Sequence, residues 1–90
     1  MIYLDNAATT PLAKEVIEVM KNAIESIFGN PSSIHKIGRI ARDEIEKARE
    51  IIAKRLNCKT NQIIFTSGGT ESNNLALKGI AFLFKNTEKN

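Results

Sequence analysis

Residues 63–75 read Ile-Ile-Phe-Thr-Ser-Gly-Gly-Thr-Glu-Ser-Asn-Asn-Leu, and they give the chain its clearest local pattern. The apolar start predicts a short buried strand over about residues 62–66, and the apolar positions from Thr70 to about Phe84 predict a helix. Gly68 and Gly69, between them, have no Cβ, so the backbone can turn sharply and approach a ligand closely. We therefore expect a strand, a glycine turn and a helix in succession.

This turn has the chemistry of an anion site. Thr66, Ser67 and Thr70 place hydroxyl groups beside amide N–H groups that have no partner inside the first helical turn. A helix N-terminus carries partial positive charge, which suits a phosphate. A plain strand-to-helix turn capped by Thr or Ser explains the same residues equally well. From these residues alone, both interpretations stay open.

Upstream of the turn, the sequence predicts two amphipathic helices, over about residues 11–27 and 33–56. Apolar residues recur at spacings of three and four in both. In order along the chain they are Val16, Val19, Met20, Ala23, Ile24 and Ile27, then Ile37, Ala41, Ile45, Ala48 and Ile52.

The residues at the helix ends predict how each helix starts and stops. Thr10 before Pro11 is typical of a cap followed by a first-turn proline, and Ser33 is placed to cap the second helix. Gly29 is expected to stop the first helix, and Asn57 to stop the second in a left-handed conformation. Inside the second helix, Gly38 predicts close packing or a kink. Near the N-terminus, Asp5 and Asn6 predict a turn.

Composition excludes several classes of protein. Hydrophobic residues make up 42% and charged residues 26% of the chain, which fits a soluble globular domain and not a disordered one. The chain has thirteen basic and ten acidic residues, and most of them alternate along the predicted helices, a pattern of solvated faces that argues against a nucleic-acid partner. No apolar run approaches membrane-spanning length. The single cysteine, Cys58, cannot form an internal disulfide, so we expect a cytoplasmic protein.

The predicted elements leave the fold incomplete. An apolar strand that leads into an apolar helix is half of a βαβ unit, and a parallel sheet needs neighbouring strands with both faces covered. The sequence contains no second convincing long strand. We therefore expect part of an α/β domain, either a fragment or a subunit that another chain completes.

Three separated motifs resemble one family in their order and spacing. They are Tyr-Leu-Asp-Asn-Ala-Ala-Thr-Thr-Pro at 3–11, Phe-Gly-Asn-Pro-Ser-Ser-Ile-His at 28–35, and Phe-Thr-Ser-Gly-Gly-Thr-Glu-Ser-Asn-Asn-Leu-Ala-Leu-Lys-Gly at 65–79. Together they resemble the N-terminal portion of a NifS/IscS-type cysteine desulfurase, within the class V aminotransferases. The resemblance covers about residues 2–84, and the three motifs together are highly specific.

The resemblance implies a fold and an activity for the complete enzyme. Its fold would be that of the fold-type I transferases that depend on pyridoxal 5'-phosphate (PLP), usually as a homodimer. It would take sulfur from L-cysteine, leave alanine, and supply an acceptor or scaffold protein in iron–sulfur cluster or thionucleoside synthesis. By motif match, Gly69 and Thr70 would bind the cofactor phosphate through backbone N–H and hydroxyl groups, and this favours the phosphate interpretation of the turn.

No catalytic residue and no metal ligand is assigned in this chain. The family's cofactor-linked lysine, the histidine and aspartate that contact the pyridine ring, the reactive cysteine and the carboxylate-binding arginine would all lie beyond its end. We interpret Lys78 as solvated or structural, Cys58 as an incidental thiol, and the lone His35 as a cap or packing residue. The 90-residue chain alone is expected to be inactive. The alternatives are a non-catalytic remnant, an interaction module, or the N-terminal part of another class V aminotransferase.

Overall fold

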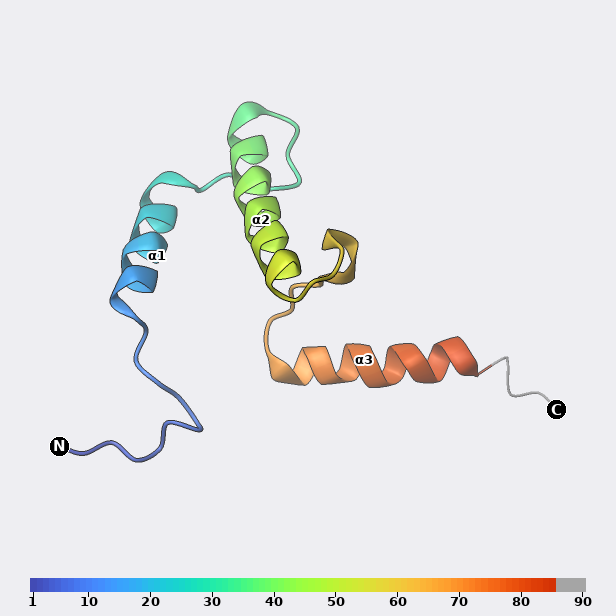
Figure 1. The fold of residues 1–90 in the computed structure, drawn as a ribbon. Helices are drawn as coiled ribbons and strands as arrows, with labels where there is room; N and C mark the ends of the chain where they lie inside the picture. The colour runs from blue at the N-terminus through green and yellow to red at the C-terminus, as the bar shows by residue number, and fades with distance from the viewer. Residues whose placement is uncertain (86–90) are drawn as a thin grey trace. The chain divides into compact units, whose positions relative to one another are not determined.

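The structure is a computed structural model that describes residues 1–85 of the chain. It contains the helices α1 (Lys14–Ser26), α2 (Lys36–Arg55) and α3 (Gly69–Phe84), with a short 3₁₀ helix, η1 (Thr60–Gln62), before α3 (Figure 1). The chain divides into two compact units, Met1–Ile51 and the residues from Ile52 onward.

The strand predicted over residues 62–66 is not found. Gln62 ends η1, Ile63 has an extended backbone (φ −103°, ψ 124°), and residues 63–66 have no regular secondary structure. A strand requires hydrogen bonds to a second strand. Residues 1–85, which the structure describes, contain no strand. We predicted an α/β fold, and the regular secondary structure in the described part of the chain consists of helices alone.

The start of α1 differs from the prediction. The helix begins at Lys14, after an extended Ala13 (φ −62°, ψ 148°) that makes no side-chain cap, so the predicted cap at Thr10 was wrong. A hydrogen-bonded turn precedes this extended segment. The Tyr3 hydroxyl lies 2.9 Å from the carbonyl oxygens of both Asp5 and Thr9 and from Thr9 Oγ1. The amides of Ala8 and Thr9 donate to Asp5 O at 3.1 and 3.3 Å, which confirms the turn expected at Asp5.

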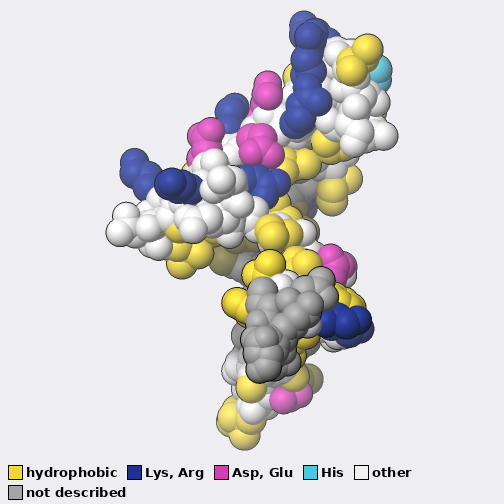
Figure 2. Space-filling view, turned by 90° about the vertical axis from the view of Figure 1, so that its right-hand side faces the viewer, with side chains coloured by type: hydrophobic (Ala, Val, Ile, Leu, Met, Phe, Trp, Pro, Cys, Tyr) yellow, Lys and Arg dark blue, Asp and Glu magenta, His cyan; other side chains and the backbone are white. Residues whose placement is uncertain are grey.

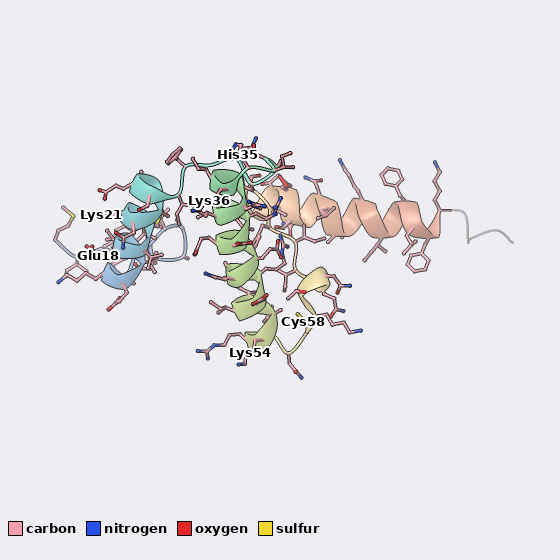
Figure 3. The ribbon with its side chains drawn as sticks, turned by 90° about the horizontal axis from the view of Figure 1, so that it is seen from above. Glu18, Lys21, His35, Lys36, Lys54 and Cys58 are labelled. Carbon is pink, nitrogen blue, oxygen red and sulfur yellow. The ribbon has the colours of Figure 1, made fainter. Side chains whose placement is uncertain are left out.

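The end of α2 follows the prediction. Asn57 has a left-handed backbone (φ 54°), as expected for a helix stop. Its N–H donates to Lys54 O at 3.3 Å, and the N–H of Cys58 donates to Ala53 O at 2.9 Å. This pair of bonds is the Schellman arrangement, which satisfies the last carbonyl groups of a helix. Lys54 and Cys58 both lie at this end of α2 (Figure 3). The backbone N–H of Cys58 thus helps to end α2.

Two glycines allow the loop between α1 and α2 to lie close to α2. A Cβ on Gly38 would lie 2.5 Å from the Asn30 carbonyl oxygen and 2.7 Å from Ser33 Cβ, and a Cβ on Gly29 would collide with the Ile37 carbonyl group. The close packing predicted at Gly38 is confirmed, and this residue is buried. Gly29 does not stop α1, which ends at Ser26, and no glycine has a left-handed backbone. Gly29 instead allows the loop to approach the Ile37 carbonyl group closely.

His35 caps the start of α2. Its Nδ1 accepts a hydrogen bond from the Gly38 N–H at 3.2 Å, so the neutral ring carries its proton on Nε2. The label in Figure 3 marks its place beside Lys36, the first residue of α2. The capping role expected for His35 is confirmed. The cap predicted at Ser33 was wrong, because α2 begins only at Lys36, and the Ser33 N–H donates to Asn30 O at 2.9 Å within the loop.

We expect replacement of His35 by Ala to destabilise α2 by about 1 kcal/mol, the typical cost of losing a helix cap. The measurement is a urea titration of the far-ultraviolet circular dichroism of the chain. His35→Asn is the control, since the Asn side-chain oxygen can accept the same N–H and should recover most of the loss. Equal stability of the Ala variant and the wild type would contradict the cap.

The charged residues cover the outer faces of the helices. Glu18 and Lys21 lie beside each other on α1 with 3.8 Å between their charged atoms, and both side chains are exposed (Figure 3). On α2, Glu44 pairs with Lys47 at 3.3 Å and Glu46 with Arg49 at 3.2 Å. Exposed pairs at this spacing contribute only a few tenths of a kcal/mol each. Most of these charged side chains are solvated, as the sequence predicted, whereas that of Arg49 is only 22% exposed.

Very little of the described chain is buried. The only buried apolar side chains among residues 1–85 are Ala41 (5% exposed) and Ala53 (2%), both on α2. Large apolar side chains are open to the surface on every helix, and Figure 2 shows them between the charged groups. On α3 they include Leu77, Phe82 and Leu83, each about two-thirds exposed or more. Within the described residues, no helix combines the length and the apolar character needed to cross a membrane.

Candidate functional site

The turn before α3 exposes backbone donors. Gly68 is the N-cap residue, and its carbonyl oxygen accepts the first helical hydrogen bond from the Ser72 N–H at 3.1 Å. Since Gly68 has no side chain, it makes no side-chain cap. The amides of Gly69, Thr70 and Glu71 therefore begin the helix without a partner inside it. Their N–H groups lie at the positive end of the helix dipole.

Three hydroxyl groups were predicted beside these amides, and the structure separates their roles. Thr66 Oγ1 lies 3.2 Å from Gly68 O and 2.6 Å from Ser72 Oγ. Ser67 Oγ donates to Glu71 Oε2 at 2.9 Å. Both are thus used within the turn. The Thr70 hydroxyl makes no hydrogen bond among the described residues, and this leaves it available to a ligand.

The turn is open to a ligand of the size of a phosphate. A Cβ placed on Gly68 or on Gly69 would meet nothing within 4 Å. Gly68 has an extended backbone (φ 166°) that any residue can adopt, so strain does not explain the glycine there. The absence of side chains instead leaves the backbone N–H groups accessible. The donor set fits a phosphate, with amides at a helix N-terminus, one unengaged hydroxyl and open space in front of them.

An apolar groove adjoins the turn. It has a volume of about 490 Å³ and lies between the segment before the turn and one face of α3. Its lining consists of Gln62, Ile64, Thr66, Ser72, Leu75, Ala76, Gly79 and Ile80. Thr66 and Ser72 belong to both the turn and the groove, so they form the boundary between the polar and the apolar part of this site.

Three other residues considered in the sequence analysis form hydrogen bonds that hold the local structure. His35 caps α2, and Cys58 closes its far end. Asn30 Oδ1 accepts the Ser32 N–H at 2.9 Å, which fixes the loop. In the part of the chain that the structure describes, no group of three or more His, Cys, Asp or Glu side chains could hold a metal ion.

Sequence reasoning placed Ser72 at the end of the expected phosphate-binding turn, Gly68 to Ser72, but gave its hydroxyl group no role. Its hydroxyl contacts Thr66 six residues earlier, across the turn. A regular period of 3.6 or 2 residues cannot relate these two positions, because the chain changes direction between them. The signal that was available is the density of hydroxyl residues, Thr66, Ser67, Thr70 and Ser72, around the two glycines.

Comparison with known proteins agrees with the motifs. The family model for class-V aminotransferases matches residues 2–89. The chain is 64% identical over 81 residues to the cysteine desulfurase IscS of Dictyoglomus turgidum, covering 90% of this chain and 21% of that protein. It is 53% identical over 81 residues to the IscS of Methanosarcina thermophila, with 90% and 20% covered.

A third relative carries another enzyme name. The chain is 52% identical over 79 residues to the human selenocysteine lyase, which covers 88% of this chain and 18% of that protein. The chain therefore spans about a fifth of the length of these curated relatives. Because the family model matches nearly all of its residues, the chain belongs to the class-V aminotransferase family.

Proposed function

We propose that this chain supplies the phosphate-binding part of a PLP-dependent cysteine desulfurase, which moves sulfur from L-cysteine to an acceptor and leaves alanine. The observation that carries the proposal is the start of α3, where the amides of Gly69 and Thr70 have no partner inside the helix and the Thr70 hydroxyl is unengaged. The names of the two IscS relatives support the choice of reaction.

Gly69 and Thr70 would hold the cofactor through its phosphate. Their N–H groups and the Thr70 hydroxyl are donors, and charge-assisted hydrogen bonds from such donors to phosphate are stronger than neutral ones. The missing side chain at Gly69 lets the phosphate reach the backbone. When bound, PLP supplies an electron sink for chemistry at the amino-acid carbon. This part of the chain binds and orients the cofactor.

Partners follow from the same proposal. The complete enzyme would act on L-cysteine and deliver sulfur to an acceptor or scaffold protein for iron–sulfur cluster or thionucleoside synthesis. The exposed apolar side chains on all three helices would be covered by the rest of a fold-type I domain, in a homodimer or with a completing chain. A cytoplasmic location agrees with the one unpaired cysteine, Cys58.

A hybrid enzyme provides the test. In it, the matching 81-residue segment of the Dictyoglomus turgidum IscS is replaced by that of this chain. We expect the Thr70→Ala variant of the hybrid to bind PLP about tenfold more weakly, since it loses one hydrogen bond to a charged group. The measurement is the equilibrium dissociation constant of PLP, followed by cofactor absorbance.

Two controls accompany this variant. Thr70→Ser keeps the hydroxyl group and should retain the affinity for PLP. Pyridoxal, which lacks the phosphate, should bind the wild-type hybrid and the Ala variant equally. Unchanged retention of PLP in Thr70→Ala would count against a phosphate role for this turn. Because one relative is named a selenocysteine lyase, L-selenocysteine is the second substrate to assay.

A further inference from the structure

We propose that Thr66, together with Ser72, is a positioning residue that aims the Gly69 N–H at the cofactor phosphate. This inference rests on the proposed function, since it concerns the same turn. Neither hydroxyl is offered as a ligand of the phosphate. Their contribution is to fix the backbone between two glycines in the orientation that binding requires.

The direction of each hydrogen bond follows from the number of protons available. Thr66 Oγ1 lies 3.2 Å from Gly68 O, and a carbonyl oxygen can only accept, so Thr66 donates its single proton there. Thr66 Oγ1 also lies 2.6 Å from Ser72 Oγ. With the Thr66 proton already used, the Ser72 hydroxyl must be the donor in that contact. Both protons are thereby engaged inside the turn.

These bonds converge on one peptide group. Gly68 O accepts from the Thr66 hydroxyl at 3.2 Å and from the Ser72 N–H at 3.1 Å, which occupies both of its lone pairs. The peptide between Gly68 and Gly69 is planar and trans, so the Gly69 N–H points opposite to that carbonyl group. Fixing the carbonyl oxygen toward Thr66 and Ser72 therefore fixes the N–H toward the open side of the turn.

No side chain among the described residues packs beside Gly68 and Gly69, so hydrogen bonds are needed to fix the backbone of the turn. Nothing lies within 4 Å of the positions where Gly68 and Gly69 would carry a Cβ, and glycine is the residue with the greatest backbone freedom. A donor that must be ordered upon binding reduces affinity, whereas one that is already oriented does not. Thr66 is half-buried at this position, which restricts its side chain.

A neighbouring hydrogen bond offers a matched control. Ser67 Oγ donates to Glu71 Oε2 at 2.9 Å, one residue away from Thr66 and at the same start of α3. This bond joins two side chains and does not touch the Gly68 carbonyl group. Its loss should leave the orientation of the Gly69 N–H unchanged. Ser67→Ala therefore separates a general loosening of the turn from the loss of this particular bond.

The experiment uses the hybrid enzyme and three variants, Thr66→Val, Thr66→Ser and Ser67→Ala. We expect Thr66→Val to bind PLP about fivefold more weakly, the effect of one ordinary hydrogen bond, and to bind pyridoxal as the wild type does. In the cofactor-free protein, amide hydrogen exchange of the peptide spanning residues 66–75 should become faster. Thr66→Ser should restore both properties, and Ser67→Ala should change neither the PLP affinity nor the pyridoxal affinity.

The outcomes distinguish the inference from the proposed function. If Thr70→Ala weakens PLP binding but Thr66→Val does not, the positioning role is wrong and the phosphate site stands. If neither variant weakens PLP binding, the phosphate site itself is wrong. Equal losses of PLP and pyridoxal affinity in Thr66→Val, or a failure of Thr66→Ser to restore binding, would also overturn the positioning role, since the effect would then not be specific to the phosphate.

Discussion

The 90-residue chain alone is expected to release no alanine from L-cysteine, whereas the hybrid enzyme is expected to release it readily. No catalytic role is assigned to any of the described residues. The one histidine, His35, holds the start of α2 through Nδ1, and the one cysteine, Cys58, closes the far end of that helix. Lys78 lies well inside α3. PLP chemistry requires groups around the cofactor ring as well as a phosphate site.

The apolar grooves on the surface also support the expectation that the isolated chain is inactive. An apolar groove of about 730 Å³ lies between α1 and α2, lined by residues that include Val19, Ala23, Ile45 and Ile51. The second groove, beside the turn before α3, is also largely apolar. Exposed apolar patches of this kind mark surfaces that other protein covers. In the hybrid enzyme, the remainder of the Dictyoglomus turgidum IscS is available to cover them.

The measurement is alanine released from L-cysteine, together with the absorbance of bound PLP. A third sample mixes this chain with a Dictyoglomus turgidum IscS that lacks its matching segment, and alanine release there would show completion by a separate chain. Robust turnover by the chain alone would contradict the interpretation of the chain as an incomplete domain. An inactive but folded hybrid that still binds PLP would contradict the desulfurase assignment and favour another class-V activity or a remnant.

Local patterns predicted the features that depend on residues near each other in the sequence. The left-handed conformation of Asn57 and the crowding at Gly38 belong to this class, because each follows from backbone conformation or from the missing Cβ. The start of α1 was predicted three residues too early. The local signal of Thr10 and Pro11 does not show that Ala13 is still extended, nor that the Tyr3 hydroxyl contacts Thr9, six positions away.

Local sequence patterns could not predict whether the strand forms or which hydrogen bonds the hydroxyl groups of the site make. Ile63 and Ile64 have the composition of a strand, but a strand forms only beside another strand, and residues 1–85 contain none. At the turn, the sequence shows which residues carry hydroxyl groups but not which protons remain free. Only the folded backbone separates Thr66, whose proton is used on Gly68 O, from Thr70, whose hydroxyl is unengaged.

Replacement of Gly38 by Ala is expected to destabilise the chain by about 3 kcal/mol, although Ala is the better helix former. Gly38 is buried in α2, and its new Cβ would lie 2.5 Å from Asn30 O and 2.7 Å from Ser33 O. Both are backbone atoms, so relief requires the loop to move away. That movement would disturb the hydrogen bond from Arg42 Nη1 to Pro31 O, 3.2 Å long, which also joins the loop to α2.

Gly79 is the matched control, because it lies inside α3 and a Cβ there would meet nothing within 4 Å. Gly79→Ala should therefore stabilise the chain by about 1 kcal/mol through helix propensity alone. Urea titrations of the circular dichroism at a helix-sensitive wavelength measure both variants in the same chain. The two substitutions are chemically identical, so opposite signs would isolate the steric cost at Gly38. A gain of stability in both variants would mean that the loop before α2 does not lie against Gly38.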